Sequence, residues 1–224
     1  MLDRQMDGLV LISPSIPAPE VVTVARRVPV VLVGDRVEDP ALDYVVNDDR
    51  AGAALAVGHL AGLGHERIAH VSGDGAGAGD RRRGYEEAMR GLGLAGLISV
   101  SDGSYTDAGG YEATKRLLSG GTHPTAIFAA NDLAALGALT ALGEAGLAVP
   151  GDVSVIGYDN TYLAALSHVS LSSVDQPRLE MGRLAVRLAL EKIESGRTEP
   201  RHEILAPTLA VRSSTGPPRR QGTH

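Results

Sequence analysis

The chain of 224 residues is 43% hydrophobic and carries a formal net charge of −6 at pH 7. Its length allows one large or two small domains with real hydrophobic cores. The acidic balance argues against direct binding of nucleic acid, because phosphate binding depends on clustered Lys and Arg. No Cys is present, which excludes disulfides, thiolate metal sites and a Cys nucleophile. No signal peptide is recognisable and no apolar run approaches about 18 residues, so we expect a cytoplasmic protein without a membrane span.

Strand patterns and helix patterns alternate along most of the chain. In order they fall at residues 8–12 (strand), 19–27 (helix), 29–33 and 44–46 (strands), 49–63 (helix), 68–72 (strand), 81–90 (helix), 97–100 (strand), 107–118 (helix), 125–130 (strand), 133–145 (helix), 154–158 and 171–174 (strands), 177–195 (helix), and 202–205 and 209–211 (strands). Strand, helix and strand in succession require parallel pairing, and strands that are apolar throughout indicate sheets covered on both faces. We therefore predict an α/β fold built on parallel sheets.

Polar residues follow several of these strands directly. Asp35 follows the second strand, Asn131 and Asp132 follow the run at the centre of the chain, and Asp159 and Asn160 follow the next strand. Ligands of open parallel sheets bind outside the carboxyl ends of the strands. Turn or helix-cap chemistry is the alternative interpretation of such residues. No nucleophile or base accompanies them, so the pattern favours a binding site over a reaction site.

Gly73–Gly79 is the most glycine-dense stretch of the chain. Its first six residues fit the G-x-G-x-x-A pattern of dinucleotide binding, and Asp102 lies at about the distance of a ribose-binding acid. The low-complexity Gly/Ala composition, followed by Asp80 and three arginines, is more typical of a flexible loop. A nucleotide-dependent Rossmann-like enzyme that uses this stretch is the alternative function.

Catalytic and metal-binding motifs are absent from the sequence. It contains no G-x-x-x-x-G-K-[ST] phosphate loop, no G-x-S-x-G nucleophile elbow and no H-E-x-x-H pair. His59, His65 and His70 are spaced by six and five residues, which does not place them on one helical face as metal ligands. We expect surface or structural histidines, no enzyme activity, no cofactor and no metal.

Several short motifs occur in one order along nearly the whole chain. They are Asn47-Asp48 with Gly52 and Ala56, Gly64 to Ala69 (GHERIA), Arg81 with Gly84-Tyr85, Pro124 to Asp132 (PTAIFAAND), Asp152 to Asp159 (DVSVIGYD) and Val211 to Ser213 (VRS). In this order and register they resemble the LacI/GalR family of bacterial transcriptional repressors. The resemblance implies two Rossmann-like subdomains of the periplasmic-binding-protein type, with an effector in the cleft between them.

The resemblance also implies how the chain is divided. The N-terminal subdomain is expected at residues 1–66 with 174–196, the C-terminal subdomain at 67–173 with 197–214, and a flexible tail at 215–224. Residues 2–8 look like the segment that enters the third strand of the first subdomain. We therefore expect this subdomain to be incomplete, the DNA-binding headpiece to be absent, and the strand at 8–12 to present an open edge.

The function implied by the resemblance is that of an effector-sensing domain of a LacI-type repressor. The effector would be a small molecule, a carbohydrate or related metabolite. Operator DNA would be bound only through the missing headpiece, the full-length protein would be a homodimer, and no membrane would take part.

The motifs match six positions to ligand binding. They are Arg81, Tyr105, Asn131, Asp159, Gln176 and Asp35. Arg81 would act as a forked donor, although from composition alone it is one charge in a solvated run of arginines. Tyr105 would pack against a flat or apolar face of the ligand, its alternative role being core filler. Asn131 or Asp132 is expected to cap the helix at 133–145, with Asp132 a helix cap instead of a ligand contact, and Thr106 is expected to cap the helix at 107–118.

Overall fold

The computed structural model describes residues 6–14, 16–74, 76–121 and 123–219. The chain divides into two compact units, between which it crosses three times. Unit 1 consists of Met1–Asp48 and Pro177–Ala206, and unit 2 of Asp49–Gln176 and Pro207–His224. Each unit is built on a parallel-rich sheet with helices on both faces, so the predicted α/β fold with parallel sheets is confirmed.

The boundaries of the two units differ from those expected. The helix α2 (Asp49–Gly62) belongs to unit 2, because it packs against α3 (Ala76–Gly91) of that unit. The strand β9 (His202–Leu205) belongs to unit 1, because it pairs with β3 (Leu42–Asn47). The boundaries expected after residues 66, 173 and 196 lie instead after residues 48, 176 and 206.

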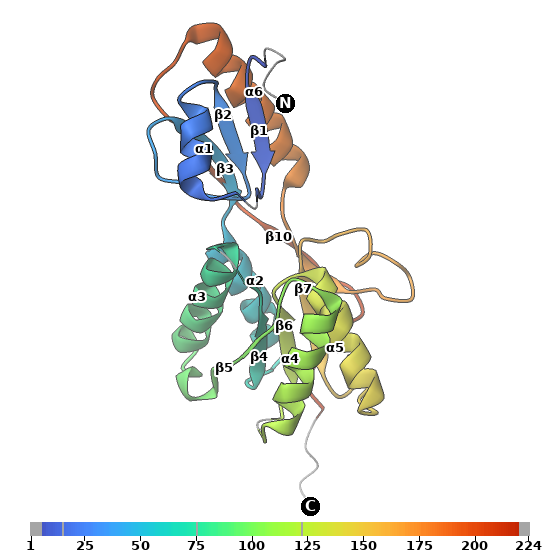
Figure 1. Ribbon diagram of the computed structural model, residues 1–224. Helices are drawn as coiled ribbons and strands as arrows, with labels where there is room; N and C mark the ends of the chain where they lie inside the picture. The colour runs from blue at the N-terminus through green and yellow to red at the C-terminus, as the bar shows by residue number, and fades with distance from the viewer. Residues whose placement is uncertain (1–5, 15, 75, 122, 220–224) are drawn as a thin grey trace, which may run out of the picture. The chain divides into compact units, whose positions relative to one another are not determined.

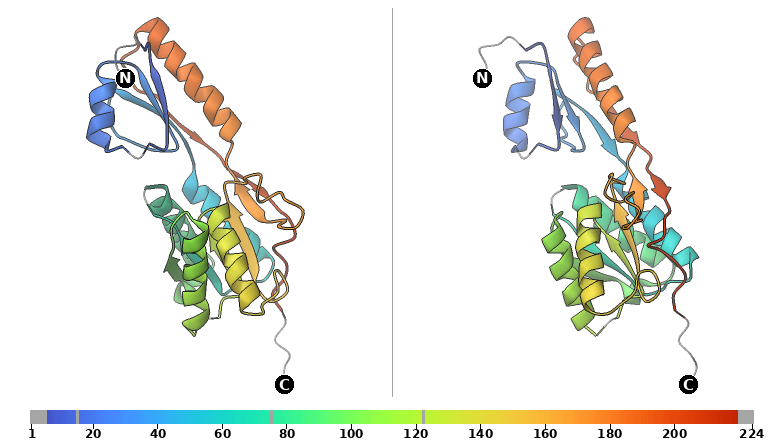
Figure 2. Two further views of the ribbon diagram at one scale, coloured as in Figure 1. Left: turned by 45° about the vertical axis from the view of Figure 1, so that its right-hand side comes forward. Right: turned by 90° about the vertical axis from the view of Figure 1, so that its right-hand side faces the viewer.

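The described residues of unit 1 contain four parallel strands in the order β1-β2-β3-β9, with β1 at Leu9–Ile12 and β2 at Val30–Val33. The helices α1 (Ala18–Ala25) and α6 (Arg178–Ser195) lie on opposite faces of this sheet (Figure 2). Apolar side chains of α1 pack on one face and those of α6 on the other. Among the described residues β1 pairs with β2 alone, which confirms the expected open edge.

Unit 2 contains a larger sheet in the order β10-β8-β7-β6-β4-β5, in which β10 runs antiparallel to β8 and the other pairs are parallel. Its strands are β4 (Ile68–Ser72), β5 (Ser99–Asp102), β6 (Ala126–Ala129), β7 (Ser154–Tyr158), β8 (Ser172–Asp175) and β10 (Thr208–Ala210). The helices α2 and α3 cover one face, and α4 (Asp107–Ser119) and α5 (Asp132–Glu144) cover the other (Figure 1). A short 3-10 helix at Ala95–Leu97 leads into β5.

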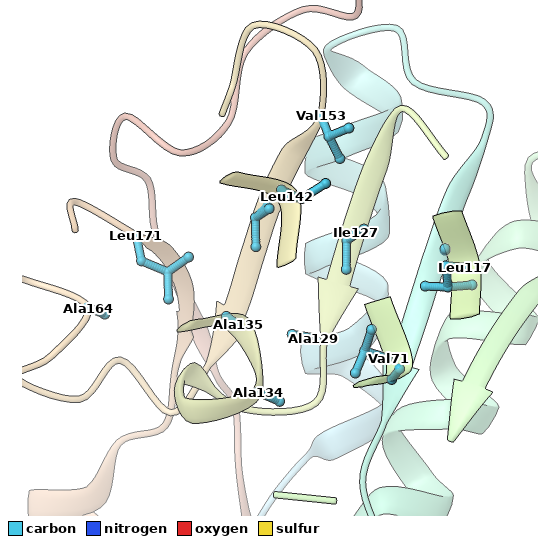
Figure 3. Packing of buried hydrophobic residues seen from close by; sticks show 13 residues of the cluster. Val71, Leu117, Ile127, Ala129, Ala134, Ala135, Leu142, Val153, Ala164 and Leu171 are labelled. Carbon is cyan, nitrogen blue, oxygen red and sulfur yellow. The ribbon is translucent and has the colours of Figure 1, made fainter. Parts of the chain in front are cut away.

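The layer between the unit 2 sheet and the helices α4 and α5 is tightly packed. Figure 3 shows Ile127 of β6 among buried side chains that include Leu117 of α4 and Leu142 of α5. The two helices approach so closely that a Cβ added to Gly110 would lie 2.1 Å from the carbonyl oxygen of Ala134. Only glycine fits such a contact. This packing fixes the starts of both helices, which lie at the carboxyl edge of the sheet.

The starts of these two helices confirm the predicted caps. Thr106 Oγ1 accepts a hydrogen bond from Gly109 N at 3.1 Å, and Asn131 Oδ1 accepts one from Ala134 N at 2.8 Å. Each bond satisfies a backbone donor that has no partner within the helix. Among the described helices, none is both long and apolar enough to cross a membrane.

The start of α3 differs from the prediction. The helix begins at Ala76 and not near residue 81, so most of the expected loop at residues 73–79 is helical. Packing explains the difference, because the first turn of α3 lies close to the start of α2, where a Cβ added to Gly77 would be 3.3 Å from Asp49 Oδ2. Contact between the two helices therefore overrides the weak helix propensity of glycine.

The expected tail at residues 215–224 is also partly wrong. Thr215 Oγ1 lies 2.9 Å from His59 Nε2, and Gly216 O lies 2.8 Å from His65 Nε2. Arg219 donates to Asp152 Oδ1 at 2.9 Å. These contacts bind residues 215–219 to unit 2 and give His59 and His65 the structural roles that were predicted. Residues 220–224 lie outside the described residues.

Candidate functional site

Arg81 projects into the interior of unit 2 and is not part of a solvated run. Only 7% of the residue is exposed. Its Nε donates to Asp49 Oδ1 at 3.0 Å, its Nη1 donates to the carbonyl of Ala130, and the same Nη1 lies 3.7 Å from Asp159 Oδ1. These partners lie at the start of α2 and just after β6 and β7. Arg81 therefore joins three elements at the carboxyl edge of the sheet.

Two tyrosine rings flank the guanidinium group. Its Cζ lies 3.8 Å from the ring centroid of the fully buried Tyr158 and 5.6 Å from that of the half-buried Tyr105. At these distances the cation is attracted to the ring faces. Burial lowers the pKa of Arg81, but the negative charges of Asp49 and then Asp159 outweigh this effect and raise the pKa above its ordinary value. Burial raises the pKa of Tyr105 and of Tyr158, so both hydroxyls are neutral near pH 7.

Asp159 and Gln176 meet just beyond the ends of β7 and β8. Gln176 Nε2 donates to Asp159 Oδ1 at 2.6 Å. The Asp159 side chain is 26% exposed, although it also pairs with Arg81. The carboxylate is thus held by neighbouring donors while part of its surface faces solvent.

The turn that carries Asp159 is held by a second polar network. Asn160 N donates to Ser173 Oγ at 3.0 Å, and Asn160 Nδ2 donates to Asp175 Oδ1 at 3.1 Å. Arg212 Nη2 donates to Asn160 Oδ1 at 2.7 Å. Asp159 and Asn160 have φ angles of +95° and +46°, in the left-handed region that residues other than glycine rarely adopt. Such strain persists only where the surroundings impose it, so the network positions the Asp159 carboxylate.

Asn131 takes the alternative role of a helix cap. Its Oδ1 caps α5 and its Nδ2 donates to Tyr105 O at 3.0 Å, so it also positions Tyr105. A direct contact between Asn131 and a ligand stays a prediction. Asp132 was expected to be a cap and is not, because it accepts hydrogen bonds from Thr161 N and Ser173 Oγ, each at 2.6 Å. The physical reason is that Asn131 has the extended backbone of a capping residue, whereas Asp132 is already helical.

Five of the six expected site residues lie in unit 2, and Asp35 does not. Asp35 follows β2 in unit 1, where its Oδ1 accepts a hydrogen bond from Arg36 N at 3.1 Å. Its role toward a ligand stays a prediction. Asp49 and Tyr158 were missed as partners of Arg81. Both lie in or beside the family motifs, but in the sequence each has an ordinary meaning, as a helix cap and as a buried strand residue.

The glycine-rich stretch packs against the candidate site and does not form a phosphate-binding loop within the described residues. A Cβ added to Gly73 would lie 2.5 Å from Tyr105 Cζ. Glycine here allows an aromatic ring, and not a pyrophosphate, to approach the backbone. No group of His, Cys, Asp or Glu side chains that could hold a metal ion occurs in the part of the chain that the structure describes.

Comparison with known proteins identifies the family. Residues 57–215 match the periplasmic binding protein-like domain family. The crystal structure of a LacI transcriptional regulator from a Rhodococcus species has a TM-score of 0.92 and 39% sequence identity, and the match covers 96% of this chain and 80% of that one. The chain belongs to the LacI family of transcriptional regulators.

Two further relatives of this LacI-family chain are a sugar-operon repressor and a sugar-bound regulator. The ribose operon repressor of Escherichia coli K12 is 33% identical over 220 residues, which are 96% of this chain and 66% of the repressor. A LacI family regulator from Enterococcus faecium with bound ribose has a TM-score of 0.85 and 28% identity, covering 94% of this chain and 80% of that chain. The chain thus spans just under two thirds of the length of the curated relative. These relatives are regulators and give no support to the alternative of a nucleotide-dependent enzyme.

Proposed function

We propose that this chain is the effector-sensing part of a LacI-type transcriptional repressor and that its effector is a sugar or a related small metabolite. The observation that carries the proposal is the convergence of four expected site residues around the buried Arg81 at the carboxyl edge of the unit 2 sheet: Tyr105, Asn131, Asp159 and Gln176. Ligands of open parallel sheets bind at this edge. The E. coli ribose operon repressor and the ribose-bound E. faecium regulator support a sugar as the effector.

The proposed roles follow from the chemistry of each side chain. Asp159 accepts hydrogen bonds from ligand hydroxyls through its exposed surface, and Arg81 donates through guanidinium N–H groups. The half-buried ring of Tyr105 packs against the apolar face of the sugar ring. Gln176 and Asn131 hold Asp159 and Tyr105 in place and complete the hydrogen bonding.

The proposal for the whole protein goes beyond this chain. Operator DNA is bound by a headpiece that this sequence does not contain, in a cytoplasmic homodimer. Effector binding shifts a two-state equilibrium that the headpiece senses. The chain itself catalyses no reaction and uses no cofactor.

A thermal-shift screen of sugars, nucleosides and dinucleotides tests the proposal, because a ligand that binds only the folded state raises the melting temperature. We expect at least one sugar to raise it. In Asp159→Ala the affinity for that sugar should fall roughly ten- to a hundred-fold for each charge-assisted hydrogen bond lost, at about 1.5–3 kcal/mol per bond. The circular dichroism spectrum should be unchanged, since the carboxylate is partly solvated.

The matched control is Glu66→Ala, which removes an exposed carboxylate just before β4, at the opposite end of the strands. Its affinity for the sugar should equal that of the unmodified chain. A shift produced by dinucleotides alone would restore the enzyme alternative. Unchanged sugar binding by Asp159→Ala would mean that the site has been misplaced.

A further inference from the structure

We infer that the effector held around Arg81 is electrically neutral and that the site rejects the phosphate ester of the same sugar. This inference rests on the proposed function and adds to it the charge class of the ligand. A sugar phosphate brings a charge of about −1.5 to −2 at pH 7 and oxygens that mainly accept hydrogen bonds. Binding of such a ligand would require a cation or a group of backbone donors that could receive this charge.

Arg81 is the obvious candidate, but its charge is already compensated. Asp49 lies 3.0 Å from its Nε and Asp159 lies 3.7 Å from its Nη1. The Nη1 also donates to the carbonyl of Ala130. Two carboxylates beside one guanidinium give this centre a net charge of −1. Arg81 can donate a hydrogen bond to a neutral oxygen, but an anion would meet the field of both carboxylates.

Two further arginines near the carboxyl edge are committed to partners as well. Arg82 pairs with Glu86 at 3.1 Å and with Asp102 at 3.6 Å. Arg212 donates to Asn160 Oδ1 at 2.7 Å, within the network that holds the turn after β7. A phosphate group would have to break one of these contacts to obtain a cation.

The helix N-termini at this edge, which are common anion sites in proteins, are filled or acidic. Thr106 caps α4 and Asn131 caps α5 through side-chain oxygens. Asp49 occupies the first turn of α2. Asp74 precedes α3, and its charge acts on the Tyr105 hydroxyl. Side-chain oxygens thus occupy two of these termini, and carboxylates stand at or beside the other two.

The remaining chemistry suits a neutral donor. Asp159 can only accept, so its exposed surface needs a hydroxyl or N–H group from the ligand. Sugar hydroxyls can donate to Asp159 and accept from Arg81 at the same time. A phosphate beside Asp159 and Asp49 would place like charges together, which disfavours binding.

The test is isothermal titration calorimetry of this chain with matched pairs of sugars and their phosphates. The probes are D-ribose with D-ribose 5-phosphate, D-glucose with D-glucose 6-phosphate, and D-fructose with D-fructose 6-phosphate. For any sugar that binds, we expect its phosphate to bind at least about tenfold more weakly, because like charges across an interface repel. Added salt should narrow this ratio, because ions screen the repulsion.

Two variants test whether charge causes the discrimination. Asp49→Asn and Asp74→Asn each remove one negative charge, from a largely buried and an exposed position respectively. Each variant should reduce the ratio of the sugar's affinity to the sugar phosphate's affinity by at least about threefold, as expected when one of several close charges is removed. The matched control Glu66→Gln removes the same charge before β4 and should leave the ratio unchanged. The exposed Asp74 position keeps the test valid if Asp49→Asn alters the fold.

The possible results separate the inference from the proposed function. A sugar phosphate that binds as tightly as its sugar, or more tightly, overturns the inference and leaves sugar sensing in place. A ratio that stays the same in both Asp variants also overturns it, because shape and not charge would then exclude the phosphate. If no sugar and no sugar phosphate binds, the proposed function fails and the inference fails with it.

Discussion

The two units of this chain share an α/β fold but differ in how completely other elements cover their sheets. Within the described residues, unit 2 has six strands with two helices on each face, and its core contains fully buried side chains as large as Tyr85 and Phe128. The described part of unit 1 has four strands with one helix on each face. At its β1 edge, Val10 and Ile12 are 37% and 74% exposed, and Val186 and Leu190 are exposed on α6.

The two exposed residues of the β1 edge, Val10 and Ile12, lie on one face of the unit 1 sheet. Val10 pairs in register with Val31, and Ile12 with Val33, and both partners belong to the core under α6. Paired residues of parallel strands point to the same side of the sheet, so Val10 and Ile12 share the face that α6 covers in part. Unit 2, with its well-covered sheet, can therefore hold a rigid site. Unit 1 leaves apolar side chains in water, which costs about 25 cal/mol of stability for each Å² left exposed.

The largest expected effect is on the core of unit 2. Phe128→Ala removes a fully buried ring that stacks on His70 with a centroid distance of 4.7 Å. It should lower the free energy of unfolding by about 3–5 kcal/mol. The matched change Ile12→Ala in unit 1 should alter it by less than about 0.5 kcal/mol, because that side chain is exposed. Urea denaturation followed by circular dichroism measures both, and similar losses would contradict the comparison.

A second effect concerns pH and the same buried layer. His70 is fully buried, and burial lowers its pKa to about 4, although its hydrogen bond to Phe128 O at 2.9 Å acts in the opposite direction. Above pH 6.5 both folded and unfolded chains are neutral at His70, so its contribution to stability is complete. As the pH falls from 6.5 to about 4, the unfolded chain binds a proton that the folded chain resists, so about 3 kcal/mol of stability is lost. Burial also lowers the pKa of His59 and of His65, which adds to the loss.

Urea titrations at pH 7 and pH 5 check this expectation. The variant His70→Gln should lose most of the pH dependence and keep the part due to His59 and His65. A midpoint for the unmodified chain that does not fall between pH 7 and pH 5 would mean that His70 is protonated in the folded state.

A third effect is local and follows from the open edge. Leu9 N and Ser13 N donate to β2-side carbonyls, so the alternation of a strand directs the N–H groups of Val10 and Ile12 away from β2. We expect these two amides to exchange hydrogen at least about a hundredfold faster than those of Ile127 and Phe128 in β6. Hydrogen exchange followed by NMR measures this. Equal protection in a monomeric sample would show that the edge is covered.

The change with the smallest expected effect on the free energy of unfolding, Ile12→Lys, should have the clearest effect on self-association of the chain. An uncharged edge such as Leu9–Ile12 is a template for pairing with a second copy. Ile12→Lys should reduce concentration-dependent association in sedimentation velocity while changing the free energy of unfolding by less than about 0.5 kcal/mol. Leu133→Lys, which adds the same charge at an exposed position of α5, is the control and should leave association unchanged. If both variants lose association, the loss results from the changed net charge and not from the β1 edge.

The sequence predicted best those features whose cause is local. The caps at Thr106 and Asn131 each depend on one side chain and a donor three residues later. The start of α3 could not be predicted, because it depends on contact between Gly77 and Asp49 of another helix. The same reason explains why the order of residues 215–219 was not predicted, since Gly216 contacts His65, which lies far away in the sequence.

The candidate site shows the same limit. Arg81 was expected at the site from a family motif, but its ion pair with Asp49 joins residues 32 positions apart. Neither residue type nor spacing reveals such a pair before the chain folds. Asn131 is a sharper case, because its amide serves as the predicted cap and also holds Tyr105 through a bond across 26 positions.

The three crossings between the units have a consequence for the order of synthesis. The strands β1 to β3 leave the ribosome before unit 2, but α6, which covers Val31, Val33 and Val45, follows only after the whole of Asp49–Gln176. At roughly 5–20 residues per second, this interval lasts on the order of ten seconds. The strands β4 to β8 of unit 2 can pair during that time, whereas one apolar face of unit 1 stays without its helix. The nascent chain therefore exposes the apolar side chains of β2 and β3 to chaperones and proteases until α6 has been made.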